Sequence, residues 1–230
     1  MKVSQNEARV IQFREDFRKN TLPKWYNGIA HITFNSVFLI GSFVFFLSQV
    51  HHLKGLEWLV IPCTLVIGNL AVYLIHRYPL HHHYPLVGHH TYRIHSKLHH
   101  QFFTHEYSRI DQLDDFYLLF FPPWTIVLFL VVHCPLAYAL IKPLLSENCA
   151  YLYLAMSTFY FILYEVFHFV SHLPAGHWLL RMRHFARMRE HHTLHHDPRL
   201  MHRYNFNVVF PLFDSIFKTT YFKPNSKQQG

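Results

Sequence analysis

The chain has 230 residues, of which 51% are hydrophobic, 18% aromatic and only 15% charged, and this composition excludes an ordinary soluble domain of its size. The formal net charge of +8 comes from 21 Lys and Arg against 13 Asp and Glu. Because nearly all of the basic residues flank apolar runs, an anionic membrane surface accounts for this charge, and no nucleic-acid partner is expected. The composition therefore predicts a membrane protein.

A polar N-terminal segment, residues 1–28, precedes the first apolar run. Val10, Phe13 and Phe17 recur there at three- and four-residue spacing between basic residues, which predicts an amphipathic helix on the membrane surface. A disordered tail is the alternative. No cleavable signal peptide is expected, because the first apolar run begins too far from the start. We separate this segment from a membrane domain over residues 29–230.

Four apolar runs are long enough, at about 20 residues each, to cross a hydrocarbon core of about 30 Å as helices. They extend over Ile29 to Val50, Trp58 to Ile75, Pro122 to Leu145 and Tyr151 to Val170. The second run is the shortest, and the third contains Pro135. The runs predict an all-α, polytopic membrane protein with four transmembrane helices.

The placement of basic residues predicts the orientation of these helices. Of the 21 basic residues, all but Lys54 and Lys142 lie in the N-terminal stretch, between the second and third runs, or after the fourth. Cytoplasmic segments collect Lys and Arg, so both termini are expected in the cytoplasm. The charge pattern fits the endoplasmic reticulum and a bacterial inner membrane equally well.

Histidine is the most informative residue type, with 23 copies, of which ten fall into four short clusters. The clusters have the spacings HX4H, HX3HH, HX3H and HX2HH, and all lie on the predicted cytoplasmic side. They consist of His76 and His81; His95, His99 and His100; His168 and His172; and His192, His195 and His196. We interpret these ten residues as the ligands of a metal centre.

Helical geometry indicates that the last three clusters each serve two adjacent metals. His95 and His99 share one face of an α-helix, whereas His100 is turned by about 140° from His95. His168 and His172 share a face but are displaced by about 6 Å along the axis, which suits two neighbouring ions. The last cluster spans an arc of about 100°, again with two ligands on one side and one toward a second ion.

Other polar residues have weaker assignments. Glu165 lies three residues before His168 and is expected to accept a hydrogen bond from an imidazole N–H. His191 and Asp214 are also expected to support the metal ligands. Asp214 and Asn205 are also expected to hold the C-terminal segment in place. Isolated histidines are treated as hydrogen-bonded or membrane-interface side chains, and they are His31, His51, His52, His133 and His177. The remaining histidines, either supporting or simply exposed, are His82, His83, His89, His90, His105, His184 and His202.

The order of these motifs resembles the fatty acid hydroxylase and sterol desaturase superfamily of integral membrane oxygenases. The resemblance covers residues 76–219 and rests on the four histidine clusters, on Leu163-Tyr164-Glu165 before the third cluster, and on the closing stretch Phe213 to Thr219. The pattern is closest to fatty acid 2-hydroxylases. The second cluster has three residues before its paired histidines, where 2-hydroxylases usually have two, so the substrate is left open.

The resemblance implies a four-helix membrane base under a cytosolic helical cap that holds a dimetal site. Carried over by position, one metal takes His76, His95, His99, His168 and His192, and the other takes His81, His100, His172, His195 and His196. Iron is the implied metal, with O2 as co-substrate, because zinc has no redox chemistry. Zinc also suits imidazole ligands and could occupy a purified sample.

The implied function is a membrane-bound di-iron oxygenase that hydroxylates a lipid acyl chain, from a fatty acid or sphingolipid, with O2. The short chain leaves no room for a haem-binding module, so electrons are expected from a separate donor of the cytochrome b5 or ferredoxin type. Sterol desaturation or C-4 methyl oxidation is the main alternative. A metal transporter or sensor is less expected, because transporter ligands lie near the bilayer midplane.

Overall fold

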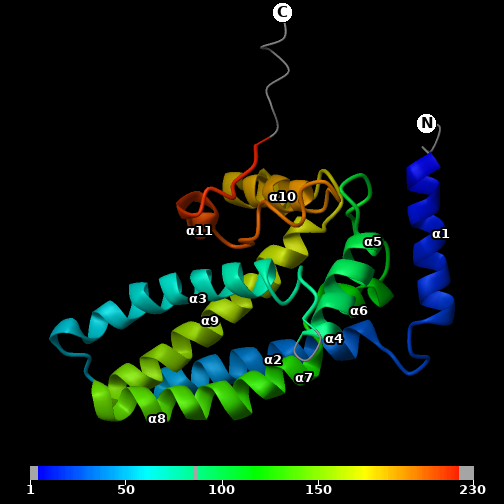
Figure 1. Ribbon diagram of the computed structural model, residues 1–230. Coiled ribbons are helices and arrows are strands. Elements are labelled where there is room, and N and C mark those ends of the chain that lie inside the picture. The colour runs from blue at the N-terminus through cyan, green and yellow to red at the C-terminus, as the bar shows by residue number, and fades with distance from the viewer. Residues whose placement is uncertain (1–4, 85–87, 223–230) are drawn as a thin grey trace, which may run out of the picture. The chain divides into compact units, whose positions relative to one another are not determined.

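The computed structural model describes residues 5–84 and 88–222, and the regular structure within these ranges is entirely helical (Figure 1). Four helical segments are long and apolar enough to cross a membrane: Gly28–Ser48, Gly55–Arg77, Pro123–Leu144 and Glu147–Ser171. They confirm the four predicted runs, with ends that differ by a few residues. The start of the predicted N-terminal segment, residues 1–4, and the C-terminal Lys223 and Lys227 lie outside the described residues.

The chain divides into two compact units, each assembled from separate stretches of sequence. The first, which we call the membrane unit, comprises residues 22–71 and 111–166. The second, the histidine unit, comprises residues 1–21, 72–110 and 167–230 and contains all ten clustered histidines. Two of the long helices, α3 (Val60–Arg77) and α9 (Glu147–Ser171), continue from the membrane unit into the histidine unit.

The membrane unit is built from long apolar helices and short connecting turns. Besides α3 and α9 it contains α2 (Gly28–Ser48), η1 (Gly55–Leu59), η3 (Leu113–Asp115), α6 (Phe116–Leu119), α7 (Pro123–Leu128), η4 (Phe129–His133) and α8 (Cys134–Leu144). The last three form one continuous rod, in which η4 is a π-helical segment just before Pro135 (Figure 1). Proline lacks the amide hydrogen of a normal helical bond, so a wider turn there is physically reasonable.

Polar side chains bond the backbone groups of Phe121, which lies in the non-helical connection between α6 and α7. The Phe121 carbonyl accepts hydrogen bonds from His31 Nε2 and Asn35 Nδ2, both at 2.9 Å. The Phe121 amide donates to Glu165 Oε1 at 3.1 Å. Side chains of α2 and α9 therefore pair the backbone groups that this connection leaves without helical partners, as an apolar environment requires.

The histidine unit is made of shorter helices joined by extended turns. Its elements are α1 (Gln5–Asn20), the end of α3, α4 (His89–Tyr92), η2 (Arg93–His99), α5 (His100–Phe102), the end of α9, η5 (Trp178–Arg181), α10 (Arg183–His195) and α11 (Leu212–Ile216). The predicted N-terminal helix is present as α1. It packs on α5, where the rings of Phe17 and Phe102 meet edge to face at 5.6 Å.

Candidate metal centre

All ten clustered histidines are buried, with exposed fractions between 0% and 8%. An imidazole ring usually keeps one nitrogen in contact with water or with a polar partner, because burying an unpaired polar atom is costly. The ten buried rings therefore need partners for their nitrogens within the histidine unit.

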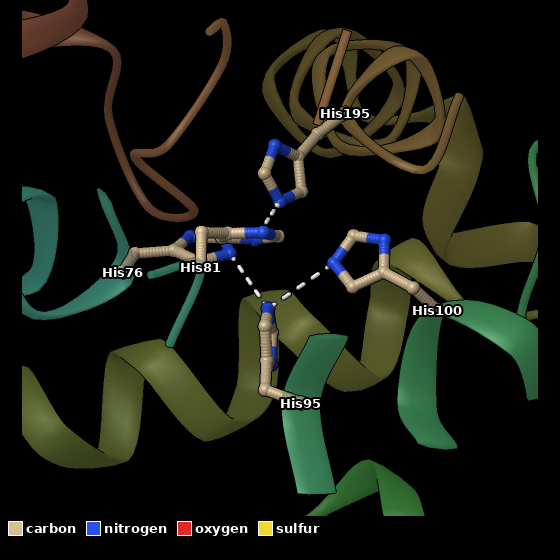
Figure 2. Close-up of side chains that lie close together, drawn as sticks. All are labelled: His76, His81, His95, His100 and His195. Carbon is tan, nitrogen blue, oxygen red and sulfur yellow. Dashed lines mark hydrogen bonds between the residues drawn. The ribbon is translucent and has the colours of Figure 1, made fainter. Parts of the chain in front are cut away.

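Five of these residues form the first histidine group: His76, His81, His95, His100 and His195. They come from the end of α3, the turn after it, η2, α5 and α10, and their rings face one another (Figure 2). One nitrogen from each lies within 4.8 Å of the corresponding nitrogen of every other member. Residues from three separate helical stretches and one turn thus converge on one small volume.

The second histidine group consists of His99, His172, His192 and His196. These residues come from η2, from the position after α9, from α10 and from its C-terminal cap. His168 of α9 lies against the same group, with its ring centroid 5.0 Å from that of His99 and 4.9 Å from that of His192. Its position one turn before His172 makes it the natural fifth member.

Spacings between ring nitrogens match those of ligands to a shared metal ion. In the first group, His95 Nε2 lies 2.9 Å from His76 Nε2 and 3.2 Å from His100 Nε2. In the second group, His192 Nε2 lies 3.1 Å from His172 Nε2 and 3.0 Å from His196 Nε2. Two nitrogens bound at about 2.0–2.1 Å to one ion, at octahedral or tetrahedral angles, are separated by about 2.9–3.4 Å.

The outer ring nitrogens fix the tautomers of several of these imidazoles. Four of them face backbone carbonyls: His76 Nδ1 faces Phe206, His195 faces Tyr204, His172 faces Ser108 and His196 faces Phe103. A carbonyl can only accept, so each Nδ1 carries the proton and each neutral ring keeps a lone pair on Nε2. The lone pairs of these four rings are available inside the two histidine groups, and the donor set fits metal ions.

Burial also keeps these rings in the form that binds metal. Desolvation lowers the pKa of His95 and His100 in the first group well below the usual value for histidine. The pKa of His172, His192 and His196 in the second group falls for the same reason, and neighbouring imidazoles add to the effect. At neutral pH the rings are therefore uncharged, which is the form that coordinates metal without first losing a proton.

The structure groups the histidines differently from the predicted division between two metals, and η2 gives the reason. An α-helix would have placed His95 beside His99 and turned His100 away. In the π-helical η2, the amide of His100 instead bonds the carbonyl of His95, five residues earlier. Residues five apart therefore become neighbours on one face. His95 and His100 consequently share the first group, and His99 joins the second.

The remaining clusters divide differently from the prediction as well. His192 and His196 are four apart on α10 and share a face, so both belong to the second group, while His195 belongs to the first. His81 joins His76 in the first group because the turn after α3 brings it back. His172 follows the end of α9, where its amide bonds the carbonyl of Phe169, so its ring meets the same neighbours as the ring of His168.

The three supporting residues predicted from sequence have different partners. Glu165 accepts from the Phe121 amide in the membrane unit, rather than from an imidazole as expected. His191 Nε2 donates to Asp214 Oδ2 at 3.0 Å, so these two residues bond each other. Asp214 also accepts hydrogen bonds from the backbone amides of Phe206 and Asn207, and the carbonyl of Phe206 faces His76.

The backbone carbonyls that bond the outer ring nitrogens could not be predicted from the sequence, because a carbonyl in a turn is not tied to any residue type. Arg14 was not predicted to support the site either; it is buried at 1% exposure on α1 beside Phe102 and Phe103. One signal was present: Arg14 lies between Val10 and Phe17 on the apolar face of the helix.

A cavity of about 810 Å³ adjoins the second group without opening onto it. Its wall includes Ser108, whose carbonyl faces His172, and Thr193, the neighbour of His192, but none of the ten clustered histidines lines it.

These features define a helical protein with candidate membrane spans and two buried histidine groups suited to metal ions. The chain matches no family model, and comparisons with curated proteins and with solved structures find no similar protein. The two histidine groups are therefore the only basis for assigning a function within the described residues.

Proposed function

We propose that this chain is a membrane-bound di-iron oxygenase that hydroxylates a lipid acyl chain with O2 and external electrons. The observation that carries the proposal is the pair of adjacent, all-histidine groups. Rings of different groups touch: the centroids of His95 and His99 lie 5.0 Å apart, and those of His100 and His196 lie 4.3 Å apart. Two ions held by these groups would be close neighbours.

The number and type of ligands favour a redox metal over structural zinc. Structural zinc sites are four-coordinate and closed, usually with cysteine among the ligands. The first group offers five imidazoles, and the second offers four with His168 beside them. Imidazole suits iron, and iron held by these residues would supply the redox chemistry that O2 requires.

The chemistry proposed is the oxidation of an unactivated C–H bond. Such a bond has neither an acidic proton nor an electrophilic carbon, so side-chain acid, base or nucleophile catalysis does not apply. Two bound iron ions would supply the reaction in which R–H, O2, two electrons and two protons give R–OH and water. The chain's own residues hold the ions, fix the ring orientations through backbone carbonyls and exclude water from the centre.

Helix topology supports a substrate from the bilayer. His76 lies at the C-terminal end of the second candidate span, and His168 in the last turn of the fourth. Alternate spans of a polytopic chain run in the same direction, so both ends reach the same membrane surface. The concentration of Lys and Arg on that side supports a cytoplasmic location. A site there would receive a lipid laterally and electrons from a soluble or membrane-bound carrier.

The test is oxygen incorporation by the purified, full-length chain in lipid nanodiscs. The protein is loaded anaerobically with Fe²⁺, supplied with a chemical reductant and exposed to ¹⁸O2, and the lipids are analysed by mass spectrometry. We expect one ¹⁸O atom in a hydroxylated acyl lipid, and none with His95→Ala as the matched control. Iron-loaded, reduced protein that produces neither a hydroxylated nor a desaturated lipid would refute the proposal.

The same analysis distinguishes the alternatives. Lipids from cells with and without the chain should differ by a hydroxylated acyl species, whereas an altered sterol profile would identify a sterol desaturase or methyl oxidase. A transporter would instead move metal into sealed vesicles without changing any lipid. We favour the enzyme because His76 and His168 lie at the ends of candidate spans, whereas transporter ligands lie near the bilayer midplane.

A further inference from the structure

The two histidine groups are oriented by two different stretches of chain. In the first group, His76 and His195 face carbonyls of the C-terminal segment, at Phe206 and Tyr204. In the second group, His172 and His196 face carbonyls of the segment over residues 102–109, at Ser108 and Phe103. Partners of this kind set the ring orientation and basicity of metal ligands. The ring orientations in each group therefore depend on the residues that hold the corresponding segment in place.

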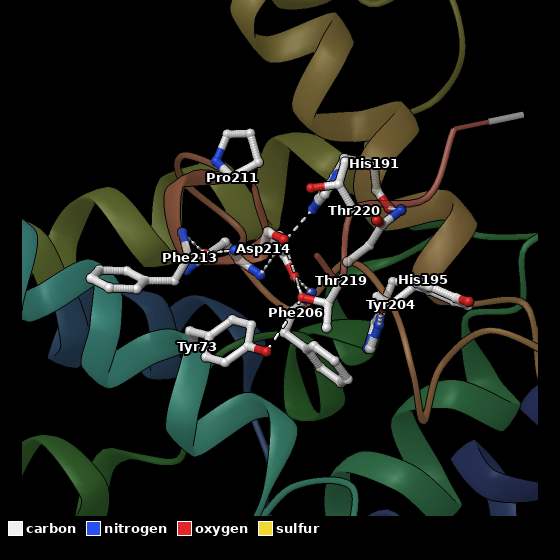
Figure 3. Close-up of polar contacts among 12 residues, drawn as sticks. Tyr73, His191, His195, Tyr204, Phe206, Pro211, Phe213, Asp214, Thr219 and Thr220 are labelled. Atoms are coloured by element: carbon white, nitrogen blue, oxygen red, sulfur yellow. Dashed lines mark hydrogen bonds and ion pairs between the residues drawn. The ribbon is translucent and has the colours of Figure 1, made fainter. Parts of the chain in front are cut away.

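Asp214 holds the C-terminal segment beside the first group. Its carboxylate is fully buried, and Oδ1 accepts from the Phe206 amide at 3.0 Å and from Thr219 Oγ1 at 2.7 Å (Figure 3). Oδ2 accepts from the Asn207 amide at 2.7 Å and from His191 Nε2 at 3.0 Å. One side chain thus connects α10, the turn at Phe206 and the segment after α11.

A planar peptide group links Asp214 to the metal ligand. The amide of Asn207 and the carbonyl of Phe206 belong to the same peptide unit, so they point in opposite directions. Because Asp214 Oδ2 holds that amide, the Phe206 carbonyl is directed away from Asp214 and onto Nδ1 of His76. Loss of the carboxylate would free this peptide to rotate and would loosen the ring of His76.

Arg14 has the corresponding position beside the second group. Its guanidinium, on the N-terminal helix α1, lies 4.4 Å from the ring centroid of Phe102 and 5.0 Å from that of Tyr107. Its Nη1 donates to the Arg109 carbonyl at 3.0 Å. These contacts surround Ser108, the partner of His172. The neighbouring Phe103 ring packs 4.4 Å from the ring of His172, and the Phe103 carbonyl faces His196.

We propose that Asp214 and Arg14 are positioning residues for different metal ions: Asp214 for the ion of the first histidine group and Arg14 for the ion of the second. Both act through the backbone carbonyls that face the rings. The inference rests on the two metal sites of the proposed function but not on its reaction. It gives the N-terminal helix a role in metal binding that an amphipathic membrane anchor would not have.

The experiment measures zinc binding to the full-length chain in detergent. Two backgrounds isolate one ion each: His95→Ala with His195→Ala removes the first site, and His172→Ala with His196→Ala removes the second. Affinity is measured by competition with a chelator, and bound zinc by elemental analysis. Asp214→Asn should weaken the ion of the first group about 10–100-fold and leave the other unchanged, and Arg14→Gln should do the reverse.

Matched controls come from the exposed face of α1. Arg9→Gln and Asp16→Asn make the same chemical changes at exposed positions and should leave both affinities unchanged. If Asp214→Asn does not fold, Thr219→Val removes one donor to the carboxylate and should weaken the same ion. If Arg14→Gln does not fold, Arg14→Lys keeps the charge but loses the flat guanidinium that lies against the aromatic rings.

Site selectivity is the decisive result. Equal weakening of both ions, or loss of the same ion from both variants, would overturn the inference, because a general loss of stability acts on both sites alike. A chain that binds two ions with the expected selectivity but oxidises no lipid would leave the inference standing and refute the proposed reaction. A wild-type chain that binds fewer than two zinc ions would refute both.

Discussion

His95 and His100 are five residues apart, yet their Nε2 atoms lie only 3.2 Å from each other. The π-helical hydrogen bond from the His100 amide to the His95 carbonyl makes this approach possible. The extra residue in the turn displaces His99 toward the second group, where its ring centroid lies 4.9 Å from that of His196. One short segment thereby contributes histidines to both groups, and π-helical turns are frequent at functional sites.

Adjacent alanine substitutions in this segment should remove different ions. His100→Ala removes a nitrogen from the first group, and His99→Ala removes one from the second. Each variant should retain about one tightly bound metal per chain when the wild type holds two, since each loses a ligand from only one site. The remaining ion is identified by adding the double substitution of His172 and His196 to each variant. Loss of the same ion from both single variants would contradict the two groups.

The four spans and the clustering of the ten histidines could be predicted because both depend on patterns of residue type. Run length and low charge identify four helices, and repeated short spacings identify ten buried histidines. The division of these histidines into two groups could not be predicted, because it depends on which backbone amide bonds which carbonyl. His99 and His100 would have been placed in their groups only if a π-turn had been expected there.

The contacts that support the histidines could not be predicted from the sequence for a related reason. Glu165 lies on the predicted face of α9, three residues before His168, yet its partner is the amide of Phe121, 44 positions away in the chain. The carbonyls that orient His76 and His172 belong to turns whose course depends on distant side chains, Asp214 and Arg14. Spacing within one helix carries no information about such long-range pairs.

Substitution of Glu165 should affect stability rather than metal content. Glu165→Ala leaves the buried Phe121 amide without its acceptor, which costs about 1–3 kcal/mol. We expect a lower unfolding temperature in detergent with two metals still bound. Glu165→Gln keeps an oxygen acceptor and serves as the control, with a smaller change. Selective loss of an ion from Glu165→Ala would instead restore the role predicted from sequence.

Close packing at Gly68 gives a test of the membrane unit. A Cβ atom at this position of α3 would lie 2.7 Å from Tyr160 Cγ on α9. Gly68→Ala should therefore force the ring aside and destabilise the protein by about 1–3 kcal/mol. Gly41→Ala on α2 is the matched control, because nothing lies within 4 Å of its added Cβ atom. Equal unfolding temperatures for the two variants would show that α3 and α9 do not pack as described.

Metal removal should separate stability from chemistry. Zinc and iron would bind through the same imidazole nitrogens, so either ion should raise the unfolding temperature relative to chelator-treated protein. An ion present at 100 times its dissociation constant adds about 2.7 kcal/mol if it binds only the folded state. Zinc has no redox chemistry, so zinc-loaded protein should be stable but unable to oxidise a lipid, whereas replacement by iron should restore oxidation. Lipid oxidation by zinc-loaded, iron-free protein would contradict a redox role for the ions, and an unfolding temperature unaffected by chelation would contradict metal binding at the histidine groups.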